Sequence, residues 1–134
     1  MILFGGSTLL TPDPIDIEVT KPVTIKLESS ISAINKGAAV GIDVSQYITS
    51  ENVVEGLREI GNLYPDGCVK ATLFSNNNKK VVLNRSSGSW GANKKMIRLS
   101  SKNGVRTDLK FTSIELSSCK IIQKAEVVWY NFSE

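Results

Sequence analysis

Alternation of apolar and polar residues runs through most of this chain and constrains its fold more than any other feature. Ile15, Ile17 and Val19 alternate with acidic residues, and the same two-residue period returns further along the chain. Such a period places one set of side chains on each face of an extended segment, which is typical of half-buried β-strands. The pattern predicts eight strands, near residues 15–19, 23–27, 38–44, 69–73, 80–83, 96–100, 111–117 and 125–132.

A single segment has helical rather than strand spacing. Its apolar residues recur at intervals of three or four positions, at Val53, Leu57, Ile60 and Tyr64. Ser50 is the expected N-cap, so the sequence predicts one short α-helix near residues 51–61. One helix cannot supply the crossovers of a parallel sheet. We therefore expect a mostly β fold, an antiparallel and jelly-roll-like β-sandwich of about eight strands, in one domain spanning residues 1–134.

Local chemistry predicts where the chain turns and what fills the core. Pro65, Asp66 and Gly67 favour a turn, and the three asparagines at 76–78 favour a hairpin tip. Residues 84–93 are rich in Ser, Gly and Asn and are expected to form a long loop around Trp90. The continuous apolar run 127–132 predicts a central strand covered on both sides, by the helix on one of them, with Trp129 in the core.

Charge is unevenly distributed along the chain, although the net charge is only +3. Through Asp66 the chain has four basic and nine acidic residues, whereas the segment from Lys79 to Lys110 has a net charge of +8. Its basic residues are Lys79, Lys80, Arg85, Lys94, Lys95, Arg98, Lys102, Arg106 and Lys110. Segregated charge of this kind is typical of surfaces that recognise a partner of opposite sign.

The residue types present argue against catalysis. The chain has no histidine, which excludes nucleophile–histidine triads, His-ligated metals and the commonest general base. No phosphate-binding glycine loop or Asp-rich calcium loop occurs. We therefore expect no catalytic residue, no metal site and no cofactor, and no motif is specific enough to name a family.

The preferred contact residues lie in the predicted loop and beside it: Arg85, Trp90, Lys94 and Lys95. Tryptophan and arginine are the residues that most often carry binding energy at interfaces. A second candidate is the acidic stripe of Glu51, Glu55 and Glu59, which recur every four residues along the predicted helix. The stripe is the better candidate if Trp90 proves to be buried.

These features favour a non-enzymatic protein-binding module, such as an inhibitor or an immunity-type antitoxin, that recognises a protein through a charged surface. The alternative is a carbohydrate-binding β-sandwich, in which Trp90 stacks on a sugar. Nucleic acid is disfavoured as a partner because aromatic residues make up only 7% of the chain and no stacking series occurs. No apolar run is long enough for a membrane-spanning helix.

Two cysteines, Cys68 and Cys119, leave their chemistry and the compartment open. As a pair they would close a loop of about 50 residues, and as free thiols they would serve as small apolar residues in strands. Localisation stays open as well. We expect a cytoplasmic protein if Met1 is the native start, and a periplasmic or secreted one if an export segment has been removed.

Overall fold

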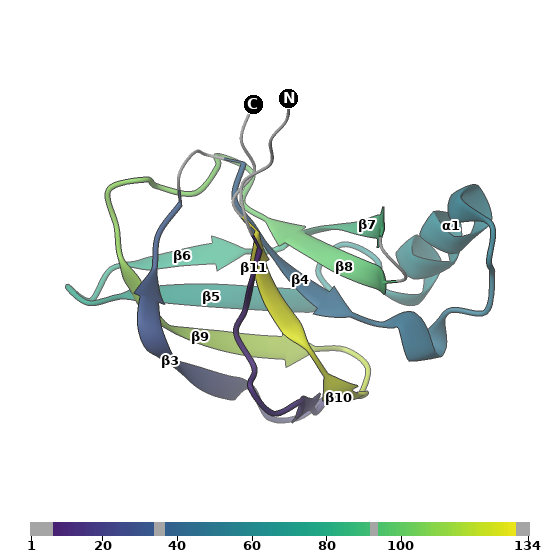
Figure 1. Ribbon diagram of the computed structural model, residues 1–134, viewed down its shortest axis with the longest axis horizontal. Helices are drawn as coiled ribbons and strands as arrows, with labels where there is room; N and C mark the ends of the chain where they lie inside the picture. Colours follow the sequence, from purple (N-terminus) through teal and green to yellow (C-terminus); the bar gives the residue numbers. More distant parts are fainter. Residues whose placement is uncertain (1–6, 34–36, 92–93, 131–134) are drawn as a thin grey trace.

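The chain folds into antiparallel sheets arranged as a sandwich (Figure 1). The structure is a computed structural model that describes residues 7–33, 37–91 and 94–130. The larger sheet, here called the five-stranded sheet, has the order β1 (Ser7–Leu9), β11 (Val127–Tyr130), β4 (Ala39–Asp43), β8 (Lys94–Ser100) and β7 (Arg85–Gly91). The four-stranded sheet has the order β3 (Val23–Ile31), β9 (Phe111–Ser118), β5 (Val69–Ser75) and β6 (Lys80–Leu83). A small third sheet pairs β10 (Ile122–Ala125) with β2 (Ile15–Ile17).

The core lies between the two large sheets and is built by the alternation seen in the sequence. In the four-stranded sheet, Ile25, Ile114 and Leu73 stand opposite one another on neighbouring strands and share its inner face. Trp129 is 1% exposed and meets the fully buried Phe111 edge to face, with ring centroids 6.3 Å apart. The predicted core role of Trp129 is therefore confirmed, and the mostly β antiparallel fold is as expected.

Three strands were not predicted: β1, β7 and β10. The prediction of a loop over residues 84–93 is wrong, because Arg85 to Gly91 form β7 and pair with β8 along their whole length. The small residues of β7 have a packing reason. A Cβ on Gly88 would lie 3.0 Å from Leu57 Cδ2, so the glycine lets the helix approach the strand closely.

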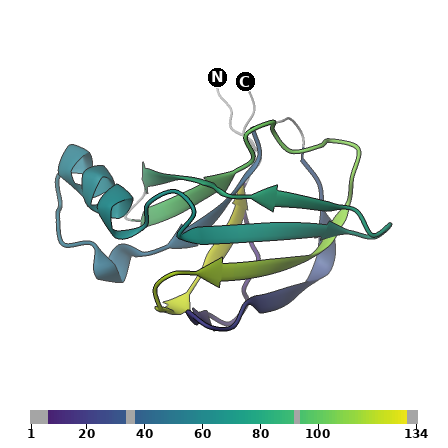
Figure 2. The same cartoon turned by 180° about the vertical axis from the view of Figure 1, so that it is seen from behind.

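Within the described residues the chain forms one α-helix, α1 (Val53–Leu63), and one short 3-10 helix, η1 (Ser45–Tyr47). The α-helix packs on β7 and stands at one end of the sandwich (Figure 2). Its N-cap is Asn52 rather than Ser50, since the Asn52 side chain accepts a hydrogen bond from Glu55 N at 3.1 Å. Ile60 is buried as predicted, whereas Val53 is 47% exposed. The expectation that the helix covers the apolar run 127–132 is wrong in the described part of that run, β11, because α1 contacts β7 and β8 instead.

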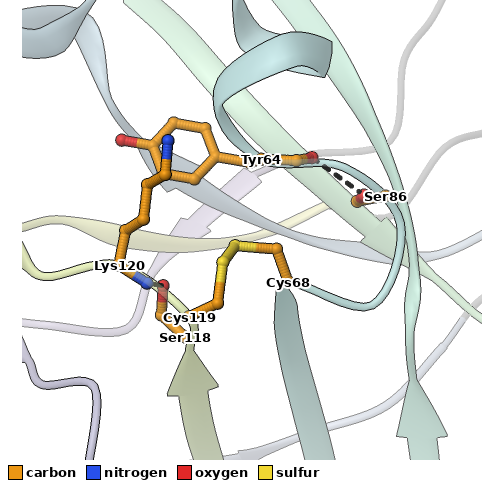
Figure 3. Close-up of a disulfide and its surroundings, with 6 residues drawn as sticks. All are labelled: Tyr64, Cys68, Ser86, Ser118, Cys119 and Lys120. Atoms are coloured by element: carbon orange, nitrogen blue, oxygen red, sulfur yellow. Dashed lines mark hydrogen bonds between the residues drawn. A yellow bond between two sulfur atoms is a disulfide. The ribbon is translucent and has the colours of Figure 1, made fainter.

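Cys68 and Cys119 form a disulfide that joins the beginning of β5 to the end of β9 (Figure 3). Their Cα atoms lie 4.9 Å apart, and Cys119 N donates a hydrogen bond to Cys68 O at 2.8 Å. The strand pairing therefore positions both cysteines for the bond. Beside it, burial raises the pKa of the Tyr64 hydroxyl, and Lys120 Nζ lies 6.0 Å from the centre of the Tyr64 ring.

The predicted turns are confirmed at Gly67 and at the asparagine tip between β5 and β6. Gly67 has a φ of 90°, a conformation that favours glycine. Within the described ranges, no helix has both the length and the apolar character needed to cross a bilayer.

Candidate functional site

The preferred contact residues of the sequence all belong to the β7–β8 pair, but Arg85 lies at the opposite end of this pair from Trp90, Lys94 and Lys95. Trp90 stands opposite Lys95 in the register, and Arg85 stands opposite Ser100. The side chains of Arg85 and Trp90 lie outside the part of the chain that the structure describes. The predicted contact role of both residues, and the sugar stacking that depends on Trp90, therefore stay predictions.

The two lysines of this pair bond to neighbouring parts of the chain. Lys94 Nζ lies 2.7 Å from Glu126 Oε1 and 4.0 Å from Asp43 Oδ2, and the hydrogen bond to Glu126 raises the pKa of Lys94. Lys95 Nζ donates to Ser50 O at 3.2 Å, just before α1. These contacts hold β8 to neighbouring segments, so both ammonium groups already have partners within the chain.

The three carboxylates of the acidic stripe have different surroundings. Glu59 accepts hydrogen bonds from the backbone N–H groups of Thr49 and Ser50, and these lower its pKa. Glu55 forms an ion pair with Arg58 at 3.1 Å. Glu51 is exposed and precedes the helix. The structure therefore brings Glu59 close to Lys95 but does not present three equivalent free carboxylates.

One hollow is a groove of about 580 Å³ between β3 and the segment from β1 to β2. The groove follows the side of the sandwich where β1 is the edge strand of one large sheet and β3 is the edge strand of the other. Along this side, the pairing of β3 with β9 is irregular between Lys26 and Ile31. The lining of the groove mixes apolar side chains with hydroxyl groups. The apolar residues include Ile15, Ile25 and Leu27, and the hydroxyl groups include Thr11, Ser29 and Ser30.

A different surface, the outer face of the four-stranded sheet, carries three lysines that form no ion pair with the described residues. Residues that stand directly opposite each other on paired strands point to the same face. One such row is Lys26, Ser113, Phe74 and Lys80, the next is Thr24, Glu115, Thr72 and Val82, and the third is Ser117 and Lys70. We call these residues together the lysine face.

The lysines of this face surround a partly apolar centre. Phe74 is half-buried and Val82 is 41% exposed, whereas Lys26, Lys70 and Lys80 are exposed. No carboxylate of the described residues lies within ion-pair distance of these three lysines. With strands roughly 4.8 Å apart and residues roughly 3.4 Å apart, the three lysine Cα positions form a triangle with sides of about 14 to 17 Å.

Further basic residues border the lysine face at both of its ends. At one end, Lys70 and Lys102 line a hollow of about 540 Å³ together with Asp66, Gly67 and Asn84. At the other, Lys110 O accepts a hydrogen bond from Asn76 N at 3.1 Å, close to the turn that carries Lys79. The basic segment 79–110 is therefore split, part of it bordering this face and part belonging to the five-stranded sheet.

Lys26 and Lys70 are the members that sequence reasoning missed. Both lie outside the basic segment, and each occupies a polar position between apolar neighbours in a strand. This alternation of polar and apolar residues indicates that both lysine side chains face outward. Only the order of the strands in the sheet shows that they share a face with Lys80.

The fold and this face together describe a small antiparallel β-sandwich whose four-stranded sheet carries three exposed lysines on its outer face. Comparison of the chain with protein-family models, with curated proteins and with solved structures finds no match.

Proposed function

We propose that this chain is a non-enzymatic protein-binding module, of the kind represented by inhibitors and immunity-type antitoxins, and that its partner docks on the lysine face. The observation that carries the proposal is the set of three lysines without an internal ion pair around Phe74 and Val82. An apolar centre with a polar rim is the usual anatomy of a protein interface. Lysines at the rim would speed the encounter with a partner of opposite charge.

The disulfide supports a location for this module. Disulfides persist in oxidising compartments and are rare in the reducing cytosol. Both cysteines of the chain are used in the one bond. We therefore propose that the module acts in a periplasmic or extracellular setting, the second of the alternatives that the sequence left open.

The test places a photo-cross-linking amino acid at Val82, on the lysine face, and as a matched control at Val54, which is 65% exposed on α1. In extracts of the source cell we expect one protein to cross-link from position 82 at low salt and not from position 54. The double variant Lys26→Gln/Lys80→Gln should abolish the cross-link. Lys120→Gln/Lys124→Gln makes the same change in net charge elsewhere and should leave it intact.

A cross-link that persists in the Lys26→Gln/Lys80→Gln variant would remove the lysine face from the proposal. Absence of any protein cross-link from position 82, together with salt-insensitive binding to a glycan array, would favour the carbohydrate-binding alternative.

A further inference from the structure

We infer that the lysine face takes an acidic protein surface that carries a basic side chain at its centre, placed to meet Glu115. The inference rests on the proposed function and adds the chemistry of the partner. It starts from Glu115, the acidic residue within the three rows that define the lysine face.

Glu115 lies on a central strand of the sheet, β9, in the middle row of the lysine face. Its nearest charged neighbours on the face are diagonal ones. Lys26 is opposite Ser113 and Lys70 is opposite Ser117, each two residues from Glu115 along β9. Such diagonal positions are roughly 7–8 Å apart between Cα atoms. Neither lysine forms an ion pair with Glu115, so the carboxylate remains available for a partner.

This carboxylate disfavours a nucleic acid on the same face. Duplex DNA carries one negative charge about every 1.7 Å of its axis, so a duplex lying across the lysines would place phosphates against Glu115. Aromatic stacking on the face would depend on Phe74 alone, and that side chain is half-buried. A protein can instead combine carboxylates for the lysines, an apolar contact for Phe74 and one cation for Glu115.

The spacing sets the form of a simple probe. Lys26 and Lys80 lie in one row, three strand spacings apart, which is roughly 14 Å. An α-helix rises about 1.5 Å per residue and turns once every 3.6 residues, so glutamates about eleven residues apart lie on one helix face, roughly 16 Å apart, and would reach both lysines. A lysine about four residues from one glutamate and seven from the other shares that helix face and lies over the row between Lys26 and Lys80, from which its long side chain can reach Glu115 in the next row.

The experiment titrates the ¹⁵N-labelled protein with two helical peptides that differ only at this central position, lysine in one and glutamine in the other. Simple attraction between opposite charges makes the lysine peptide the weaker ligand, because it carries less negative charge. The inference predicts the reverse. The lysine peptide should bind roughly two- to fivefold more tightly, the range of one exposed ion pair. Amide shifts should change in β5, β6 and β9.

Two variants and one further probe sharpen the result. Glu115→Gln should reverse the preference, whereas Lys26→Gln/Lys80→Gln should weaken the binding of both peptides. A 20-base-pair DNA duplex should bind more weakly than the lysine peptide in the same buffer. Tighter binding of the duplex, tighter binding of the glutamine peptide, or no peptide binding would each overturn the inference. If a cross-link from Val82 is nevertheless found, the proposed function survives and only the partner chemistry is wrong.

Discussion

On the outer face of the five-stranded sheet, the position of the Tyr130 side chain depends on the absence of a side chain at Gly41. The Tyr130 ring lies over Gly41, at the place where any other residue would carry a Cβ. Tyr130 Oη donates a hydrogen bond to Met96 Sδ at 2.6 Å, which fixes the ring from the far side. Burial raises the pKa of that hydroxyl, so it remains a donor in neutral solution.

We expect Gly41→Ala and Gly61→Ala to change stability in opposite directions. At Gly41 the new Cβ would lie 2.6 Å from Tyr130 Cε2, so the ring must move, and overpacking of this kind costs about 1–3 kcal/mol. At Gly61, in the helix, a Cβ would meet no atom within 4 Å. Alanine there should stabilise the fold by roughly 0.5–1 kcal/mol through helix propensity. Urea unfolding of both variants measures the difference, and a neutral Gly41→Ala would show that the ring is loosely held.

At the scale of the element, α1 depends on contacts before its first turn. The Glu59 carboxylate reaches back to Thr49 and Ser50, and the Lys95 ammonium group reaches Ser50 from β8. The helix has two glycines in eleven residues, which lowers its intrinsic propensity. Its position therefore depends on these anchors and on its packing against β7.

Acid should release the Glu59 anchor. Hydrogen bonds from Thr49 and Ser50 hold the pKa of Glu59 below its ordinary value of 4.5. A lowered pKa stabilises the folded state above the unfolded-state pKa, and this stabilisation is lost as pH falls through the lower, folded-state value. NMR titration should show the Thr49 and Ser50 amides shifting together below pH 4.5. In Glu59→Gln this transition should be absent, and its persistence there would assign it to another carboxylate.

The comparison of sequence with structure also belongs to the scale of elements. Alternation located most strands because each has one face on the core, as with Leu73 and Ile114. It missed β7 because serine and glycine predominate in that strand, where Gly88 lets α1 approach closely. The lysine face was predictable only in part. The apolar neighbours of Lys26 in the sequence indicate that its side chain faces outward. Its alignment with Lys80 depends on the strand order across the whole sheet.

At the scale of the molecule, the disulfide is the one covalent link between distant parts of the chain. It joins residues 51 positions apart and closes a loop containing β5 to β9. Replacing both cysteines by serine should lower the free energy of unfolding by about 4 kcal/mol, because the unfolded chain then gains loop entropy. Denaturant unfolding of the variant and of the reduced native chain should agree. A loss below about 1 kcal/mol would contradict the entropic account.

The two large sheets are connected very differently on their two sides. On one side Asn84 alone separates β6 from β7, so the chain passes directly from the edge of one sheet to the edge of the other. On the other side β1 and β3 are both edge strands, with the groove between them. Separation of the layers therefore meets a one-residue covalent tether on the first side, whereas residues 10–22 form a longer connection on the second.

The pairing of β1 with β11 has a mechanical consequence. Ser7 stands opposite Tyr130, and the two strands run antiparallel from that point. A load entering the fold at Ser7 and leaving at Tyr130 would pull along the direction of their hydrogen bonds, which lie perpendicular to the strands. The bonds would then break one after another instead of resisting together in shear. Under tension from its ends, the sandwich would peel open at low force, beginning at β1.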